Sequence, residues 1–576
     1  MPNPEPQSPT RYDVIVIGSG HAGCEAALAS ARMGCQTLML APNLDRIGYM
    51  PCNPSIGGPG KSQIVSEVDA LGGAMARAAD QTVMQVRQLN TSKGPAVRAI
   101  RAQCDKSLYA AVMKQILEGQ PNLEVVQDQA LGLLIDGHSS PQVAGIEARI
   151  LGKISATAVV ITAGTFLRAR MIAGEDRSIG GRAGDAADSR LSGSLADLGL
   201  RLRRFKTGTP PRLDVRSIDV SKTEPQFGDD VPLWLSRDGR EGCIPQLRLP
   251  APSTGPFAAV RELGGRYQVP CHQTWTNDEA HQVIRQNLHR APMYNGSIEG
   301  AGPRYCPSIE DKVGRFVDKA SHPVFIEPEG WMSGEAYIQG MSTSLPADVQ
   351  ADVIHCIPGL ENSRITRFGY AVEYDALDAT ELTHALEYRR IGGLFFAGQV
   401  NGTSGYEEAA GQGIVAGANA GARVQSLPQL SMGRSDGYIG VMIDDLVSLP
   451  FDEPYRMLTS RAEYRLVLRS DTADARMLPE ASRLGLISDQ RAEQVRTENT
   501  VVEETLHQLA TLWFGANPIH SVALEAAGIQ PANRSLSALD IVRRPQVSLH
   551  SVLSACAALG MVGTERPARY VLERVE

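Results

Sequence analysis

The sequence lacks the features that define several classes of protein. Its nine cysteines contain no C-x-x-C pair, which argues against a structural zinc site or a thioredoxin-type dithiol. No apolar run reaches the length of a membrane span, and no internal repeat or low-complexity block occurs. We expect no metal site. The odd number of scattered cysteines suits the reducing environment of the cytoplasm.

The N-terminal stretch MPNPEPQSPTR has no apolar core of the kind found in a signal peptide. Its polar, proline-rich composition predicts a disordered tail at residues 1–11. The whole chain of 576 residues is 43% hydrophobic and 21% charged, which is typical of a globular protein. Its length indicates about four domains.

Aromatic residues are scarce and positive charge is not in excess. Aromatics make up 5% of the chain and the formal net charge is −8, which excludes a uniformly basic nucleic-acid-binding protein but not a local basic surface. The candidates for such a surface are Arg87, Lys93, Arg98 and Arg101; Arg201, Arg203, Arg204 and Lys206; and Arg461, Arg465 and Arg469. The last three are spaced to share one helix face, although YRLVLR could equally form a strand. A charge run is more often a solvated face.

The strongest local pattern is YDVIVIGSGHAGCEAALASARMG, residues 12–34. An apolar, β-branched run at residues 14–17 predicts a buried parallel strand. Gly18, Gly20 and Gly23 follow at G-x-G-x-x-G spacing, and an alanine-rich helix then runs to Gly34. In this context the first glycine makes the tight turn, the second lets a pyrophosphate approach, and the third lets helix and strand pack closely. The pattern predicts a dinucleotide on the helix N-terminus.

The rest of the chain predicts an α/β fold built around this unit. We expect further strands at residues 35–41, 123–127, 130–135, 143–150 and 156–166, and a strand followed by a small-residue helix within 393–421. The fold class is a two-dinucleotide-type Rossmann FAD-binding domain with an inserted α/β domain and a mostly helical C-terminal domain. The expected boundaries are a 1–11 tail, 12–206 with 365–430 for the Rossmann-like domain, 207–364 for the insert and 431–576 for the helical domain.

Two details depart from simple nucleotide-binding patterns. The second strand ends at Ala41 and Pro42, where dinucleotide-binding folds often place an acidic residue for the ribose, so the ribose partner stays open. Gly60-Lys61-Ser62 is similar to the end of a P-loop, but position 55 is Ser55 and no strand precedes the motif. A nucleoside triphosphatase is therefore rejected.

Several longer motifs carry a resemblance to a known family. They are CNPSIGG, DALGG, LNTSKGPAVRA, GGRAGD, KTGTPPR, GPRYCPSIEDK, AGQVNGTSGYEEAAGQG and PYRMLTSRAEYRLVLR, together with the glycine-rich stretch described above. With them the sequence resembles the MnmG (GidA) family, the flavoproteins of tRNA wobble-uridine modification, from about Tyr12 almost to its end. A shorter relative, the folate-dependent tRNA uridine C5-methyltransferase family, lacks the long C-terminal extension and is the alternative.

The resemblance implies an activity and its partners. It implies a cytoplasmic homodimer that binds FAD and works in a heterotetramer with a GTPase, MnmE. The pair would add an aminomethyl or carboxymethylaminomethyl group to C5 of the wobble uridine in the tRNA anticodon loop. Methylenetetrahydrofolate would give the carbon, ammonium or glycine the amine, and NADH the reducing power. Two further alternatives are a plain NADH:flavin oxidoreductase and a non-catalytic, FAD-dependent tRNA-binding scaffold.

The resemblance also assigns residues. FAD contacts are implied at Gly18, Ser19, Gly20, His21, Ala22, Gly23, Ala130, Asp188 and Gln399; the family tends to have serine at the position of Asp188. NAD contacts are implied at Gly302, Pro303, Arg304, Tyr305, Cys306, Pro307, Ser308, Ile309, Glu310, Asp311, Lys312, Val313, Gly314, Arg315 and Phe316. Family members usually continue with a further helical stretch associated with docking of the GTPase and tRNA, and we expect both contacts to be weakened in a chain that ends at Glu576.

Cys52 and Cys306 match the two cysteines that the family is thought to use in catalysis. A single cysteine is more often a small buried hydrophobe than a nucleophile. Addition of a thiolate at C6 of uracil would nevertheless make C5 a carbon nucleophile, and this requires a cation or a helix end that favours the thiolate. Which of the two thiols attacks C6 stays open.

Overall fold

The structure is a computed structural model that describes residues 11–187, 189–249, 255, 257–302, 307–562 and 568–575. The chain divides into two compact units, Met1–Ser470 with Arg483–Leu486, and Asp471–Ser482 with Ile487–Glu576. Among the described residues, no helix combines the length and the apolar character that a bilayer crossing needs.

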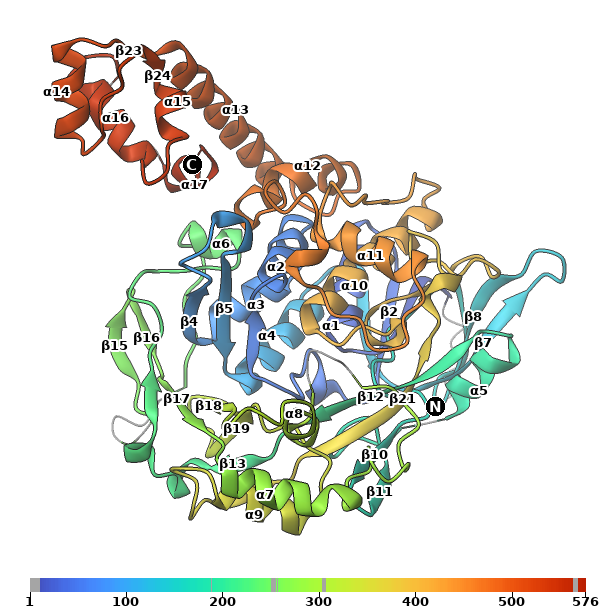
Figure 1. Ribbon diagram of the computed structural model, residues 1–576. Helices are drawn as coiled ribbons and strands as arrows, with labels where there is room; N and C mark the ends of the chain where they lie inside the picture. Colours follow the sequence, from blue (N-terminus) through green and yellow to red (C-terminus); the bar gives the residue numbers. More distant parts are fainter. Residues whose placement is uncertain are drawn as a thin grey trace. The chain divides into compact units, whose positions relative to one another are not determined.

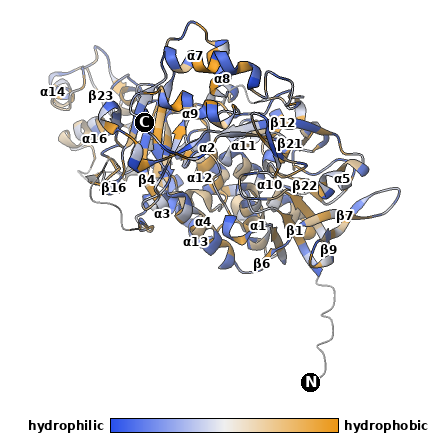
Figure 2. Ribbon diagram, turned by 90° about the horizontal axis from the view of Figure 1, so that it is seen from below, coloured by the Kyte–Doolittle hydropathy of each residue, from blue (hydrophilic) through white to orange (hydrophobic). Residues whose placement is uncertain are grey.

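Seven strands form the central sheet of the first unit (Figure 1). Their order is β6 (Leu123–Gln127), β2 (Thr37–Ala41), β1 (Arg11–Ile17), β9 (Gly152–Ile161), β8 (Gln142–Ala148) and β7 (Ala130–Asp136), with β22 (Leu394–Phe396) paired to the end of β9. Strands β6, β2, β1, β9 and β22 are parallel, whereas β7, β8 and β9 form an antiparallel meander. Strand β1 is coloured as hydrophobic in Figure 2, as expected for a strand buried on both faces.

The strand predictions for this sheet are confirmed, with differences at strand ends. Strand β2 begins at Thr37 rather than at residue 35, and β9 begins at Gly152 rather than at residue 156. Strand β9 ends at Ile161 rather than continuing to residue 166, because the chain then turns, with the Phe166 backbone N–H donating to the oxygen of Ala163 at 3.0 Å. Strand β8 ends before Ile150, whose backbone N–H donates to the Asp128 carboxylate at 3.1 Å instead of a neighbouring strand.

The helices of the first unit are α1 (His21–Arg32), α2 (Lys61–Ala70), α3 (Met75–Thr82), α4 (Lys106–Glu118), α5 (Arg190–Asp197), α6 (Arg237–Arg240), α7 (Asp278–Asn287), α8 (Ile309–Arg315), α9 (Ala347–His355), α10 (Tyr406–Val424) and α11 (Tyr438–Ser448). Helices α1 and α10 pack directly together. A Cβ at Gly413 or Gly417 would lie 2.2 Å from the backbone oxygen of Ala22 or Ala26, respectively. Small residues in both helices therefore permit this close packing.

Smaller sheets complete the first unit. One has the order β3 (Ser55–Gly57), β5 (Ala99–Cys104) and β4 (Val83–Leu89). A second is β11 (Asp176–Ile179), β10 (Arg170–Ala173), β21 (Tyr370–Leu377) and β12 (Leu202–Thr209). A third is β14 (Glu224–Gln226), β17 (Cys271–Trp275), β18 (Pro323–Pro328), β19 (Glu335–Gln339), β13 (Arg212–Asp214) and β20 (Ile365–Arg367), and a hairpin joins β15 (Val260–Leu263) to β16 (Arg266–Gln268).

The second unit is mostly helical and has its own apolar core. Its elements are α13 (Asp489–Thr511), α14 (Pro518–Ala526), α15 (Ala538–Val542), α16 (Leu549–Ala558), α17 (Arg569–Val575) and the pair β23 (Trp513–Phe514) and β24 (Leu536–Ser537), with most of α12 (Ala473–Arg483). Leu509, Leu524, Ile541 and Val552 are among the side chains of that core. Together the two units confirm the predicted α/β class with a Rossmann-like sheet.

Candidate functional site

The glycine-rich turn between β1 and α1 opens on a pocket. Gly18 has a φ of +107°, and a Cβ there would lie 2.6 Å from the backbone oxygen of Thr162. A Cβ at Gly23 would lie 2.0 Å from the oxygen of Gly18, whereas a Cβ at Gly20 would meet no atom within 4 Å. Gly18 and Gly23 are therefore required by the protein's own packing, while the space above Gly20 is open to a ligand.

The N-terminus of α1 faces the same turn without local neutralisation. Gly20 is the N-cap and has no side chain to accept from the first backbone N–H groups, and the first turn of α1 contains no acidic residue. The positive end of the helix dipole is thus available to an anion. Phosphate groups commonly bind at helix ends of this kind.

The pocket has about 900 Å³ of space not filled by protein atoms, its open mouth included. Three sets of residues line it: the β1 turn with the ends of β2 and β9, the start of β7, and the segment 182–191. They are Ile17, Gly18, Ser19, Gly20, Leu40, Pro42, Asn43, Arg46, Asp128, Gln129, Ala130, Thr162, Ala163, Gly164, Phe166, Leu167, Arg182, Asp185, Ala186 and Leu191. Its size and its mixture of apolar walls with a few polar groups suit a cofactor.

The predicted FAD residues fall in different places. Those that line the pocket are Gly18, Ser19, Gly20 and Ala130. His21, Ala22 and Gly23 are buried in the first turn of α1. Gln399 is half-buried in the short helix after β22 and is not part of the pocket lining, and Asp188 lies outside the described residues.

Two arginines that the sequence did not single out reach the pocket. Arg46 and Arg182 both line it, and their guanidinium carbons lie 4.6 and 5.0 Å from the ring centre of Tyr49. Arg182 also lies 5.5 Å from the ring centre of Phe166 and forms an ion pair with Asp185. These arginines can contact phosphate or stack on a flat ring. Arg46 follows the second strand closely and Arg182 belongs to the GGRAGD motif, but neither residue was assigned a role from the sequence.

The residues after β2 indicate which side chain could contact the ribose of a bound dinucleotide, a question that the sequence left open. Pro42 and Asn43 line the pocket, while the Asp45 side chain is 88% exposed and forms an ion pair with Lys114 at 3.5 Å. The Asn43 side chain accepts from the Asp45 backbone N–H at 2.9 Å. Asn43 is therefore better placed than Asp45 to contact a bound ribose.

His21 lies in an aromatic environment beneath the turn. Its ring stacks on Tyr406 with centres 4.6 Å apart, and Tyr109 lies 5.7 Å away on a tilted ring. Burial, together with the charge of Arg182, lowers the pKa of His21 to about 3. His21 is therefore neutral at physiological pH and serves as packing rather than as a cation.

Cys52 lies at a junction of several elements of the first unit. Its backbone N–H donates to the Tyr406 hydroxyl at 2.8 Å, and its thiol donates to the backbone oxygen of Gly208 at 3.6 Å. The side chain of Arg212 donates to the backbone oxygen of Pro51 at 2.5 Å. Cys52 is partly exposed. Cys306, its predicted companion, lies outside the described residues.

The predicted NAD segment is described only in part, because Pro303, Arg304, Tyr305 and Cys306 are outside the described residues. Most of the rest forms α8, capped by the Ser308 hydroxyl. Glu310 is fully buried and accepts from the Ser344 backbone N–H at 2.9 Å, and Lys312 donates to the backbone oxygen of Gly340 at 2.9 Å. These polar side chains hold the helix in place.

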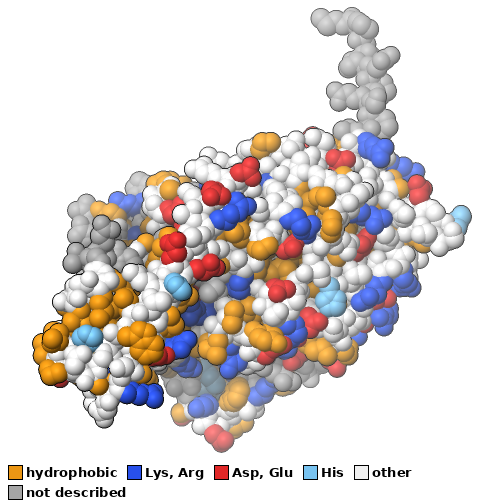
Figure 3. Space-filling view, turned by 90° about the horizontal axis from the view of Figure 1, so that it is seen from above, with side chains coloured by type: hydrophobic (Ala, Val, Ile, Leu, Met, Phe, Trp, Pro, Cys, Tyr) orange, Lys and Arg blue, Asp and Glu red, His pale blue; other side chains and the backbone are white. Residues whose placement is uncertain are grey.

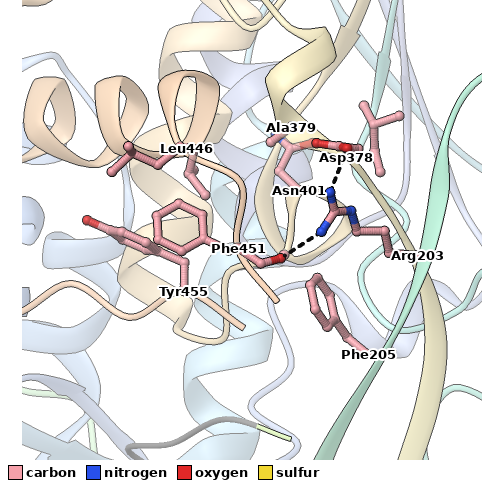
Figure 4. A pocket seen from close by; sticks show the side chains of 11 residues that line it. Arg203, Phe205, Asp378, Ala379, Asn401, Leu446, Phe451 and Tyr455 are labelled. Atoms are coloured by element: carbon pink, nitrogen blue, oxygen red, sulfur yellow. Dashed lines mark hydrogen bonds and ion pairs between the residues drawn. The ribbon is translucent and has the colours of Figure 1, made fainter. Parts of the chain in front are cut away.

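The predicted basic clusters are largely neutralised within the protein. Arg204 pairs with Glu373 at 3.1 Å and Asp375 at 2.9 Å on β21. Figure 4 shows Arg203 in a small pocket, donating to Asp378 at 2.9 Å and to the backbone oxygen of Phe451 at 3.1 Å. On the face drawn in Figure 3, basic side chains are interspersed with acidic ones.

The other two basic groups differ in exposure. Arg101 forms an ion pair with the buried Glu327, and Arg87 donates to the Gln226 side chain at 3.1 Å. Lys93 and Arg98 lie on the loop between β4 and β5 and are exposed. They are the better candidates for contact with RNA phosphates.

The expectation that Arg461, Arg465 and Arg469 share one helix face is wrong, and so is the strand alternative. Residues 462–469 form turns, with Ala462 and Leu468 buried at the two ends and residues 463–467 exposed between them. Arg461 lies over the Tyr455 ring at 4.6 Å and forms an ion pair with Asp445 at 3.4 Å. Anchoring of both ends in the core overrides the helical spacing.

The glycine-rich turn with Lys61 is a structural junction. Lys61 Nζ lies 2.9 Å from Glu407 and 3.3 Å from Glu408, two carboxylates in the first turn of α10. Gly57 donates its backbone N–H to Glu407 at 2.7 Å. With its lysine paired in this way, the motif does not bind a nucleoside triphosphate in the manner of a P-loop.

The fold and the pocket define an α/β protein with a dinucleotide-binding, Rossmann-like domain. Residues 13–428 match the family described as Glucose inhibited division protein A. The chain therefore belongs to the Glucose inhibited division protein A (GidA) family.

Similar proteins extend over nearly the whole chain. It is 49% identical to the tRNA uridine 5-carboxymethylaminomethyl modification enzyme MnmG of Chloroflexus aurantiacus, over 93% of this chain and 83% of that protein. A protein of the same description from Streptococcus pneumoniae is 46% identical over 94% of this chain and 82% of its own length. The crystal structure of Aquifex aeolicus GidA in its form II crystal has a TM-score of 0.85 and 40% identity, covering 98% of this chain and 86% of that one.

Proposed function

We propose that this chain is an FAD- and NADH-dependent tRNA modification enzyme that adds a (carboxymethyl)aminomethyl group to C5 of the wobble uridine. The observation that carries the proposal is the 49% identity, over 93% of the chain, to a protein named for this reaction. The pocket at the β1–α1 turn supports the cofactor part of the proposal, because its open glycine and helix N-terminus suit a pyrophosphate.

The residues of the pocket fit FAD in distinct ways. The backbone N–H groups around Gly20 would bind the pyrophosphate, and Asn43 is positioned for the ribose. Arg46 and Arg182 would contact a phosphate or stack on a ring at the pocket wall. Bound FAD would accept a hydride from NADH, and the protein would orient the reactants and exclude water.

The nucleophile that adds to uracil C6 is the thiolate of Cys52 or Cys306. A thiolate sulfur bonds to C6 of uracil, and the electron pair of the C5–C6 double bond moves toward O4, which makes C5 nucleophilic. C5 then bonds to a one-carbon electrophile derived from methylenetetrahydrofolate, whose amine substituent comes from ammonium or glycine. Loss of the C5 proton and expulsion of the thiolate restore the double bond. The wobble base lies in a single-stranded loop and can be splayed into a site.

Reduction by NADH separates this proposal from its alternatives. Purified protein is expected to be yellow and to bleach when NADH is added anaerobically, and then to modify tRNA when methylenetetrahydrofolate, glycine and the GTPase partner are present. Absorbance near the flavin band and mass analysis of the wobble nucleoside are the measurements. Bleaching without tRNA modification would indicate a plain NADH:flavin oxidoreductase, colour without bleaching would indicate a scaffold, and formation of 5-methyluridine would indicate a methyltransferase.

The assembly is proposed from the same resemblance: a homodimer that forms a heterotetramer with a GTPase partner, MnmE. Light scattering of the purified chain, alone and mixed with that GTPase, measures both masses. A monomer at micromolar concentration, or no complex with the GTPase, would contradict this part of the proposal without affecting the cofactor assignment.

Binding of tRNA is expected to weaken steeply with salt, because an acidic chain must meet RNA through a few local cations. We expect the combined variant Lys93→Ala and Arg98→Ala to reduce the slope of log K against log salt by about one to two. Filter binding from 50 to 300 mM KCl is the measurement. Lys222→Ala is the matched control, since Lys222 is also exposed but pairs with Glu361 at 2.9 Å. A flat salt response of the unmodified protein would exclude phosphate contacts as the main attraction.

A further inference from the structure

A cluster of buried charges lies next to Cys52. Lys106 is the first residue of α4, Arg212 lies in β13 and Glu329 follows β18, and the three are only 3%, 6% and 8% exposed. Lys106 Nζ and Arg212 Nε both bind Glu329 Oε1, the latter at 3.0 Å. Two cations therefore share one carboxylate oxygen.

The backbone holds this cluster in place. The Lys106 backbone N–H donates to the backbone oxygen of Glu329 at 3.1 Å. The Asp105 carboxylate, which caps α4, also accepts from the Trp331 backbone N–H at 2.8 Å. The turn that carries Glu329 is thus bound to the start of α4 on both sides. The charges are positioned by the fold and not by the rotamer of one side chain.

Arg212 connects the cluster to Cys52. Its Nη2 donates to the backbone oxygen of Pro51 at 2.5 Å, and its Nη1 donates to Thr209 Oγ1 at 2.6 Å. The chain segment just before Arg212 also supplies the Gly208 oxygen, which accepts from the Cys52 thiol at 3.6 Å, so the attraction of the cations must outweigh the loss of this weak hydrogen bond when the thiol ionises. One short segment therefore sets both the position of the cation and the position of the sulfur.

In the ion pairs of the cluster two cations meet one carboxylate, because the nearby Asp105 carboxylate accepts from the backbone N–H groups of Ser107, Leu108 and Trp331 instead. Lys106 and Arg212 have Glu329 as their shared carboxylate, and the Tyr337 ring adds a weaker attraction, with its centre 5.4 and 5.0 Å from the two cations. An uncompensated cation is costly to bury. Burial lowers the pKa of Lys106 to about 8, although Glu329 opposes this change. An anion at Cys52 would offset the excess charge.

The positive charges of Lys106 and Arg212 attract a thiolate at Cys52. Burial lowers the pKa of both cations, and Glu329 raises it. A negative charge on Cys52 raises it as well. Electrostatic coupling is mutual, so the two cations favour the anionic form of the sulfur by the same interaction. Cationic neighbours are the usual cause of reactive thiols.

The other titratable groups near Cys52 do not compete for this role. Tyr370 lies in β21 and Tyr406 in α10, and burial followed by the charge of Cys52 raises the pKa of both, so both are neutral near pH 7. Arg182 acts on Tyr370 from the side of the pocket, and Glu407 acts on Tyr406. Among the described residues, Lys106 and Arg212 are buried cations that interact electrostatically with Cys52.

We propose that Lys106 and Arg212 are positioning residues that hold Cys52 Sγ as a thiolate at neutral pH, with Glu329 fixing the two cations side by side. The proposal rests on the proposed function in taking Cys52 as a nucleophile toward uracil C6. It specifies how that nucleophile is activated: no general base removes its proton during turnover, because the resting enzyme already holds the anion.

The test is the pH dependence of alkylation at Cys52 in the whole purified protein. Iodoacetamide labelling from pH 5 to 10, followed by mass spectrometry of the peptide that contains Cys52, gives the midpoint of the thiolate titration. We expect a midpoint at least about one unit below the ordinary thiol value of about 8.5. A midpoint at or above about 8.5 would overturn the proposal without any variant.

Variants then assign the effect to the cluster. Lys106→Met should raise the midpoint by about one unit, a tenfold loss of thiolate at neutral pH, whereas Lys106→Arg should keep it. Glu329→Gln should shift the midpoint in the opposite direction, because it removes the anion that competes with the sulfur. Loss of structure would not give opposite shifts, and the exposed Cys243 is an internal reference that should label alike in all variants. Equal midpoints in Lys106→Met and unmodified protein would overturn the role of Lys106.

The same experiment distinguishes this inference from the proposed function. A low midpoint combined with full tRNA modification by Cys52→Ser would leave the activated thiol in place but refute its use in the reaction. A midpoint near 8.5 combined with inactive Cys52→Ser would support the function of Cys52 and overturn the activation by Lys106 and Arg212.

Discussion

Cys52→Ser is expected to lower the rate of tRNA modification by at least about 1000-fold while the protein keeps its FAD. A serine hydroxyl has a much higher pKa than a thiol and is a poor nucleophile without an adjacent base, so the bond to uracil C6 would form far more slowly. A 1000-fold loss corresponds to about 4 kcal/mol of lost transition-state stabilisation. The fold should be unaffected, because the substitution changes one atom of a partly exposed side chain.

The measurement is single-turnover modification of tRNA, with absorbance at the flavin band as the parallel readout. Cys243→Ser is the matched control, since that thiol is exposed on a separate segment and should leave the rate unchanged. Cys306→Ser should resemble Cys52→Ser if the two cysteines serve successive steps. Full modification by both variants would refute the thiolate mechanism, whereas loss of FAD from Cys52→Ser would place Cys52 in the cofactor site.

The nucleotide-binding half of the protein was predictable because its signals are local. Residues 12–34 contain a β-branched run, three glycines and an alanine-rich helix in succession. Each of these patterns indicates one local backbone conformation. The structure gives each glycine a separate environment, with a Cβ at Gly18 or Gly23 colliding with backbone and one at Gly20 meeting nothing. Such local consistency is what makes a sequence pattern informative.

The walls of the pocket were not predictable in the same way. Arg46 and Arg182 are far apart in the sequence, and although Arg182 belongs to the GGRAGD motif, nothing in that motif places it beside Arg46. The buried charges at Lys106, Arg212 and Glu329 are separated by more than a hundred residues each. Contacts of this kind depend on how the sheets are placed in the fold. A single sequence does not indicate which distant residues will contact each other.

The arginine row shows the opposite error, a local pattern that tertiary structure overrides. The spacing of Arg461, Arg465 and Arg469 fits a helix face, but Leu468 is fully buried and the preceding five residues are exposed turns. Helical spacing is a weak predictor in a short polar segment, since a few buried anchors outweigh propensity. The cluster around Arg203 and Arg204 was also misleading, because β21 and the residue that follows it supply carboxylates that the sequence places about 170 residues away.

Gly20→Ala is expected to weaken FAD binding by about 10- to 100-fold without destabilising the protein. The added Cβ meets no protein atom within 4 Å, and the backbone of Gly20, with a φ of −73°, is accessible to any residue. In the complex that Cβ would occupy space needed by the pyrophosphate, and overpacking of this kind costs about 1–3 kcal/mol. Flavin fluorescence titration of the apoprotein measures the affinity, and the thermal midpoint of the apoprotein measures stability.

Gly23→Ala provides the contrast that makes the interpretation specific. Its Cβ would lie 2.0 Å from the backbone oxygen of Gly18, so the helix must move away from the strand and the apoprotein itself should lose several degrees of thermal midpoint. Unchanged FAD affinity in Gly20→Ala would show that the pyrophosphate does not pass over this glycine. Equal destabilisation of the two apoproteins would show that the space above Gly20 belongs to the protein's own packing and not to a ligand. The two glycines differ by three positions in one motif, yet one should report on the cofactor and the other on the fold.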